Sequence, residues 1–183
     1  MPAALTAIIE DARMDVVTAD SELPQPELYL VSACLLGVAC RFDGKSNLVA
    51  ELYDMVTTGL AVPICPEVAG GLTTPRLPAE IENAAAGLDG GAVLDGQTRV
   101  IRSDGVDVTS QFIKGAQAAL ALAHRLGIGR AILKADSPSC GAGRIHEGRF
   151  EGKLVPGDGV TAALLKRNGI QVTTETDLRG EAR

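Results

Sequence analysis

Four short apolar segments, separated by longer stretches with helical periodicity, most limit the folds open to this chain. They read LYLVSA (28–33), LAVPIC (60–65), RAILKA (130–135) and IQVTT (170–174). An apolar run of this length, bounded by turn residues, is typical of a strand buried on both faces. Alternating strands and helices predict a single α/β domain: a mainly parallel sheet with helices on both faces, in a Rossmann-like three-layer arrangement.

Capping and turn residues predict where these elements end. Three helices are expected after N-caps at Ser46 or Asn47, at Thr109 or Ser110, and at Asp158, with ends near Gly59, Gly127 and Asn168–Gly169. The segment AVLDGQTRVI (92–101) predicts a small β-hairpin, with Asp95–Gly96 in its turn. We expect an N-terminal helix and linker extension over 1–27, the domain over 28–174 and a C-terminal tail over 175–183.

The composition excludes several classes of protein. Hydrophobic residues make up 46% of the chain and aromatic residues only 3%, so aliphatic side chains must fill the core. The net charge of −6 argues against a protein that follows a nucleic-acid backbone, which needs a basic face. We also expect no membrane span, because no apolar run approaches the roughly 20 residues that a span requires. Because the N-terminus does not resemble a signal peptide, we expect a cytoplasmic protein with reduced cysteines.

Three of the four cysteines follow predicted strands. Cys34, Cys65 and Cys140 each lie just beyond the carboxyl end of one, in turns that contain glycine or proline. Ligands of open α/β sheets bind outside these carboxyl ends, so the sheet can bring the three thiols together. Three thiolates suggest a metal centre, either a tetrahedral zinc or a four-iron cluster, with one coordination position left open for chemistry.

The other metal-binding or nucleophilic side chains are weaker candidates. Cys40 lies in a loop with no strand before it and is interpreted as a bystander rather than a fourth ligand. His124 falls within a predicted helix and is expected at the surface, whereas His146 is a weak site candidate. A single buried cysteine is often a small packed hydrophobe, but three in similar turns make coincidence a poor explanation.

Five motifs together resemble a known family. They are SACLLG…CRFDG, PICPEVAGGLTTPR, DVT, KADSPSCG and GDGVTAALLKRNGI, spread over residues 28–174. This order is similar to that of the family that includes the 2-thiouracil desulfidases, formerly a domain-of-unknown-function family. The resemblance implies a [4Fe–4S] cluster held by Cys34, Cys65 and Cys140, whose fourth iron is open. It further implies replacement of C=S by C=O on a thiolated pyrimidine such as 2-thiouracil, without net electron transfer and with release of hydrogen sulfide.

Candidate catalytic residues lie next to the expected ligands in sequence. Glu67 follows Cys65 by two residues and is our predicted acid/base; Ser137 is its predicted partner or a substrate orienter, with Asp136 in reserve. The predicted substrate-binding residues are Ser139, Lys134, Arg76 and Phe42. Phe42 departs from the tyrosine expected in many relatives, so it can offer a ring but no hydroxyl. Each polar residue among these also has a structural interpretation, as a turn cap or a surface charge.

Two further functions fit the same residues. One is a zinc or iron–sulfur protein without catalysis, a scaffold or a sensor. The other is a metal-free thiol enzyme with Cys140 as its nucleophile. The acid/base groups beside the cysteines favour an enzyme over a sensor, and its expected partner is a small thiolated pyrimidine rather than a nucleic acid.

Overall fold

A four-stranded parallel sheet forms the centre of the computed structural model, which describes residues 27–180. Its strands are β1 (Tyr29–Ser32), β2 (Ala61–Ile64), β5 (Arg130–Leu133) and β8 (Gln171–Thr174), in the order β2-β1-β5-β8. All four predicted strands are therefore confirmed, each within two residues of its expected ends. The helix and linker were expected over residues 1–27, of which 1–26 lie outside the described residues.

The strand order changes direction between β1 and β5. From β1 the chain moves outward to β2, then crosses to the other side of β1 and continues through β5 to β8. At such a switch point the loops that follow the two neighbouring strands run to opposite sides of the sheet and leave a crevice between them. The loops after β1 and β5 carry Cys34 and Cys140, so the topology places both at the switch point.

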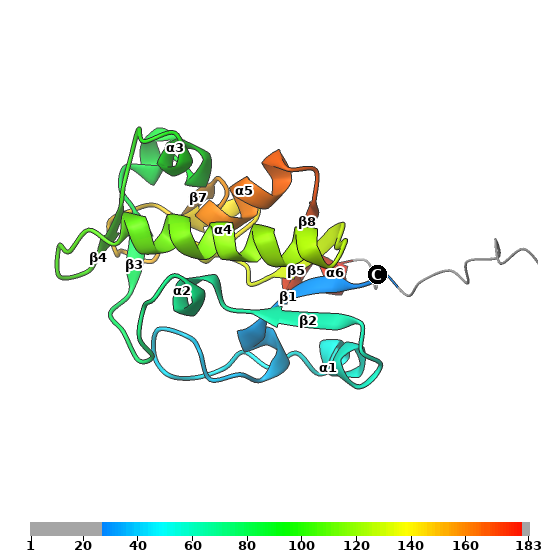
Figure 1. The fold of residues 1–183 in the computed structure, drawn as a ribbon. Coiled ribbons are helices and arrows are strands. Elements are labelled where there is room, and N and C mark those ends of the chain that lie inside the picture. The colour runs from blue at the N-terminus through cyan, green and yellow to red at the C-terminus, as the bar shows by residue number, and fades with distance from the viewer. Residues whose placement is uncertain (1–26, 181–183) are drawn as a thin grey trace, which may run out of the picture.

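Helices cover both faces of the sheet, as predicted (Figure 1). α4 (Thr109–Arg125) and α5 (Val160–Arg167) pack on the face formed by Leu30, Ala131 and Leu133. α1 (Ala50–Thr57) packs through Leu52 on the face formed by Val31 and Ile132. Alternate strand residues thus enter opposite cores, as the two-residue period of a strand requires.

The predicted hairpin at 92–101 is wrong. Residues Gly90–Leu94 form α3, capped by Asp89, whose carboxylate accepts a hydrogen bond from the Gly91 amide at 2.9 Å. Asp95–Gly96 ends that helix instead of turning a hairpin, and Gly96 adopts a positive φ of 71°. The later half of the segment becomes β4 (Val100–Arg102), which pairs with β3 (Ala79–Ile81). A second antiparallel pair is formed by β6 (Arg144–His146) and β7 (Leu154–Pro156).

The predicted N-caps are also wrong, although the helices exist. α1 begins only at Ala50, beyond Ser46 and Asn47. The Thr109 hydroxyl accepts a hydrogen bond from the Val100 amide, and the Thr109 amide donates to Asp107. Asp158 accepts from the Gly143 amide at 2.7 Å and pairs with Lys166 at 2.7 Å. The Thr109 and Asp158 side chains thus accept from the Val100 and Gly143 amides, outside their own helices, which local sequence does not indicate.

A short helix, α2 (Pro66–Ala69), lies directly against α4. Two glycines allow this approach: a Cβ on Gly115 would lie 1.9 Å from the Pro66 carbonyl oxygen, and one on Gly70 would lie 2.0 Å from that of Gln111. The contact fixes the segment that carries Cys65 and Glu67 over the end of the sheet.

Three short elements complete the described chain: η1 (Ala33–Leu36), η2 (Ala84–Ala86) and α6 (Glu175–Gly180), the last of which lies in the region assigned to a tail. Within residues 27–180, the helices are all too short or too polar to cross a membrane.

Candidate active site

A cavity of about 350 Å³ opens at the carboxyl end of the sheet. One wall comes from the loops after β1, β2 and β5, and the rest from β3, β6 and the segment around Phe42. The cysteines Cys34, Cys40, Cys65 and Cys140 all line it. The three cysteines that were expected to meet therefore line one cavity, and Cys40 lines it too.

All four thiols are free, and three of them lie close to one another, whereas Cys140 packs in the core on the other face of the sheet. The Cys65 thiol donates to the Cys40 carbonyl oxygen, with a sulfur–oxygen distance of 3.7 Å, and Cys34, Cys40 and Cys65 pack in one cluster. The neighbouring Cys34 thiol, followed by burial, raises the pKa of Cys40, and the Cys40 thiol together with burial raises that of Cys65. Burial raises the pKa of Cys140 to about 12. A metal must therefore displace protons from these thiols, and its uptake should release acid.

The donor set fits an iron–sulfur cluster. Within residues 27–180, no group of three or more His, Cys, Asp or Glu side chains is arranged around a single point, as one metal ion would require. The ligands of a four-iron cluster bind different irons, so they must share a cavity rather than a point. The thiols match the preference of iron–sulfur clusters for soft ligands, and the cavity also holds the carboxylates of Glu67, Glu80 and Asp136.

Glu67 and Arg76 form a buried ion pair at the cavity. The Glu67 carboxylate accepts from both Nε and a terminal nitrogen of Arg76 at 2.8 Å, and the two side chains are only 17% and 6% exposed. Arg76 also donates to the Cys40 carbonyl oxygen at 3.1 Å, which ties the pair to a cysteine loop. Glu67 is therefore held in a fixed orientation among the thiols, and Arg76 acts here as its anchor.

The three polar residues in the loop before Cys140 have different surroundings. Asp136 lines the cavity in a left-handed backbone conformation (φ 63°), with its carboxylate paired to Arg144 at 2.8 Å. The Ser137 hydroxyl lines the cavity and accepts from the amides of Ser139 and Cys140 at 3.1 Å, which leaves its proton free to donate. Ser139 does not line the cavity: it is fully buried, with its hydroxyl 2.9 Å from that of Thr161. This placement favours a structural role for Ser139.

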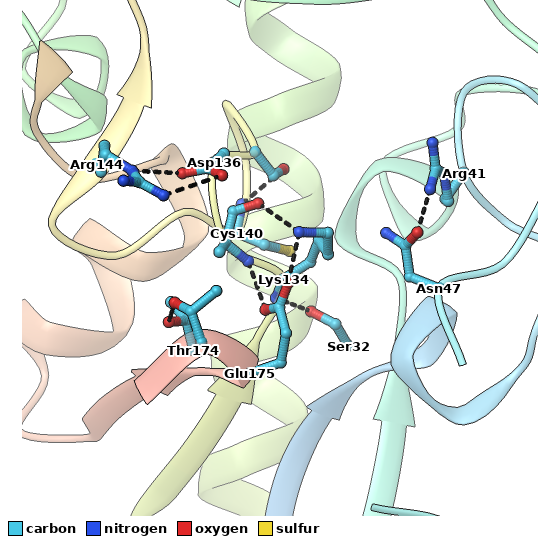
Figure 2. A network of polar contacts seen from close by, with 12 residues as sticks. Ser32, Arg41, Asn47, Lys134, Asp136, Cys140, Arg144, Thr174 and Glu175 are labelled. Carbon is cyan, nitrogen blue, oxygen red and sulfur yellow. Dashed lines mark hydrogen bonds and ion pairs between the residues drawn. The ribbon is translucent and has the colours of Figure 1, made fainter. Parts of the chain in front are cut away.

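Lys134 lies at the cavity edge and is not free. Its ammonium is 2.5 Å from the Glu175 carboxylate, which also accepts from the Ala135 amide at 2.7 Å (Figure 2). The Lys134 amide in turn donates to the buried hydroxyl of Ser32, another cavity residue. Glu175, which the sequence analysis assigned to a tail, therefore helps to hold Lys134 and Ala135 in place at the cavity.

The Phe42 ring lines the cavity mouth and is 42% exposed. The Arg41 guanidinium lies 5.8 Å from the centre of this ring and bonds to Asn47 and Asp43. Figure 2 shows the Arg41–Asn47 pair apart from Lys134 and Cys140, and both groups line the same cavity. Phe42 thus gives the cavity an apolar ring without a hydrogen-bonding group.

Glu80 and His146 line the cavity too, and sequence reasoning missed the first and ranked the second low. Glu80 stands between Ala79 and Ile81 in a short strand, and His146 follows Ile145 in another. For Glu80, the signal available in the sequence was a charged residue between two apolar residues in an extended segment.

Comparisons with known proteins agree with this geometry. The model of the 2-thiouracil desulfurase family matches residues 29–177. YbbK of Bacillus subtilis (strain 168), a protein named as uncharacterised, is 43% identical over 151 residues, which is 82% of this chain and 97% of YbbK. A solved structure of TudS, named a [4Fe-4S]-dependent thiouracil desulfidase, is 46% identical with a TM-score of 0.73, covering 85% of this chain and 95% of that one. The chain belongs to the 2-thiouracil desulfurase family.

Proposed function

We propose that this protein removes sulfur from a thiolated pyrimidine such as 2-thiouracil, giving the oxo base and hydrogen sulfide. The observation that carries the proposal is that Cys34, Cys65 and Cys140 share one cavity with the anchored carboxylate of Glu67. Family membership and the printed activity of TudS support it. The reaction exchanges sulfur for the oxygen of water, so it needs neither an oxidant nor a reductant.

The cofactor in this proposal is a [4Fe–4S] cluster held by Cys34, Cys65 and Cys140. When bound, it supplies a thiophilic Lewis-acidic iron for the exocyclic sulfur of the base. Cys40 stays a predicted bystander, although it lines the same cavity. The predicted cytoplasmic location agrees with four free cysteines and remains a prediction.

The side chains of the cavity handle protons and position. Glu67, fixed by Arg76, accepts a proton from the attacking water, and the Ser137 hydroxyl donates a hydrogen bond to the substrate. Asp136 is committed to Arg144 and stays in reserve as the acid/base. Phe42 covers the flat base, and Lys134 and Arg76 orient carboxylates rather than binding the substrate directly.

Anaerobic purification tests the proposal directly. Iron and acid-labile sulfide are quantified, and 2-thiouracil is then added while uracil and sulfide are measured. We expect nearly four irons per chain, and uracil and sulfide in equal amounts without added reductant. Colourless, iron-free protein that still converts 2-thiouracil would favour the metal-free thiol enzyme, whereas loaded but inactive protein would favour a scaffold or sensor.

A further inference from the structure

The side of the cavity formed by β3 and β6, called the hairpin side below, carries polar groups that the proposed chemistry does not use. In β3, Ile81 enters the core, so Glu80 points the other way; in β6, Ile145 does the same and His146 points into the cavity lining. Both residues therefore face the cavity from outside the central sheet. Figure 1 shows β3 and β4 beyond the end of the sheet toward which β2 points.

Pairing within the described chain sets these two residues apart from the other charged groups of the cavity. Arg41 is paired with Asp43, Arg76 with Glu67, Lys134 with Glu175 and Asp136 with Arg144. Glu80 has no cationic partner among residues 27–180: Oε2 accepts from the Gly148 and Phe150 amides, both at 2.9 Å, and Oε1 accepts from no described group. Its side chain is nevertheless buried, at 8% exposure of the residue.

His146 is similarly without a partner. Its ring bonds to none of the residues between 27 and 180, and its Nδ1 is buried. The other buried atom of this kind, Oε1 of Glu147, at least lies 3.8 Å from the Lys153 ammonium. A buried polar atom without a partner is costly and is retained where a ligand satisfies it, which applies here to Nδ1 of His146. Oε1 of Glu80 is unpaired but not fully buried.

We propose that Glu80 and His146 form the subsite that recognises the polar edge of the pyrimidine ring. Oε1 of Glu80 accepts a hydrogen bond from a ring N–H, and the His146 ring bonds to the neighbouring exocyclic oxygen. The inference rests on the proposed function, because it assumes a pyrimidine in this cavity. It assigns base selectivity to residues of β3 and β6, whereas the cysteines lie in other segments of the chain.

The test uses uracil, which has the same polar edge but no sulfur to bind iron. Glu80→Gln is the informative variant, because its amide oxygen can keep accepting from Gly148 and Phe150 while its NH₂ group replaces the free oxygen. We expect the Kd for uracil, measured by calorimetry on anaerobic, cluster-loaded protein, to rise about 10-fold or more, since a hydrogen bond to a charged group is lost. His146→Ala should raise it about 2- to 10-fold.

Methylated ligand and matched variants make the result specific. 1,3-Dimethyluracil has no ring N–H, so wild-type protein should bind it more weakly than uracil, and Glu80→Gln should reduce that difference several-fold. Glu82→Gln and His124→Ala are the controls: Glu82 is paired with Arg99 at the surface, and His124 is exposed on α4. Both should bind uracil as wild-type protein does, and all variants should keep the same iron content.

The outcomes separate the subsite from the proposed function. If wild-type protein binds uracil with this Glu80 dependence but leaves 2-thiouracil unchanged, the desulfidase proposal fails and the subsite stands. If 2-thiouracil is turned over while Glu80→Gln and His146→Ala bind uracil normally, the subsite is refuted. If wild-type protein neither binds uracil nor converts 2-thiouracil, both proposals fail.

Discussion

The buried pair of Glu67 and Arg76 allows the catalytic role of Glu67 to be separated from a structural one. Glu67→Gln keeps an oxygen that can accept from Arg76 but removes the negative charge. The guanidinium, with its side chain only 6% exposed, is then left without its partner. Removing one member of a buried pair typically costs about 3–5 kcal/mol of stability, and the 17% exposure of Glu67 places the expected loss near the lower end of that range.

Arg76→Met and the double variant Glu67→Gln/Arg76→Met complete a mutant cycle. The double variant buries no unpaired charge, so its free energy of unfolding in urea should lie closer to that of wild-type protein than either single variant does. If Glu67 takes the proton from water, kcat per bound iron should fall about 10²–10⁴-fold in both variants that lack the carboxylate. Arg76→Met, which keeps the carboxylate but loses its anchor, should lose less.

A purely structural Glu67 gives the opposite pattern. The two single variants would then lose activity together with stability and iron, and the double variant would recover all three. Uracil formation from 2-thiouracil, followed anaerobically and normalised to iron, distinguishes the two patterns. Recovery of kcat in the double variant would refute the catalytic assignment.

Three other predictions follow from the same structure. Alanine at Cys34, Cys65 or Cys140 should each abolish most iron binding in a colorimetric iron assay, whereas Cys40→Ala should retain it; iron loss in Cys40→Ala would make it a ligand. Gly115→Ala should destabilise the protein by about 1–3 kcal/mol in urea and lower its turnover, because the new Cβ meets the Pro66 carbonyl that precedes Glu67. Gly129→Ala is the control: nothing lies within 4 Å of its new Cβ, so stability should change by less than about 1 kcal/mol. 2-Thiouridine 5′-monophosphate should have a kcat/KM at least about 10-fold below that of 2-thiouracil, because the three cations of the cavity are already paired; equal values would show that one of those pairs opens to bind phosphate.

The sheet and the cysteine positions could be predicted because they depend on short segments and one general rule. Apolar runs identify buried strands, and parallel strands bring their carboxyl ends to one edge, whatever the sequence distance between them. Cys34 and Cys140 are 106 residues apart and still line one cavity. The predicted hairpin failed because Asp95–Gly96 is a local signal that serves equally well to end a helix. The later half of that segment, β4, pairs instead with β3, residues 79–81.

The partners of the site residues could not be predicted, because they depend on tertiary contacts. Arg76 was expected to face the substrate, and only the position of α2 shows that it anchors Glu67. Glu175 was assigned to a tail because nothing local connects it with Lys134, 41 residues earlier. Glu80 gave a visible signal, a carboxylate between apolar residues, but its meaning depends on which face of β3 is turned to the core.

The two sides of the cavity also differ in how they are built, and this bears on where substrate choice can change. The loops of Cys34 and Cys140 continue directly from β1 and β5, in which residues such as Leu30, Val31 and Leu133 are fully buried, so a shift there would disturb the sheet. The hairpin side is joined across its two small sheets by the Gly148 and Phe150 amides on Glu80. A substitution at Glu80 or His146 therefore alters the ligand-facing groups while the strands that position the thiols stay in place. Variants at Glu80 or His146 should therefore show an altered base preference while their iron content stays unchanged.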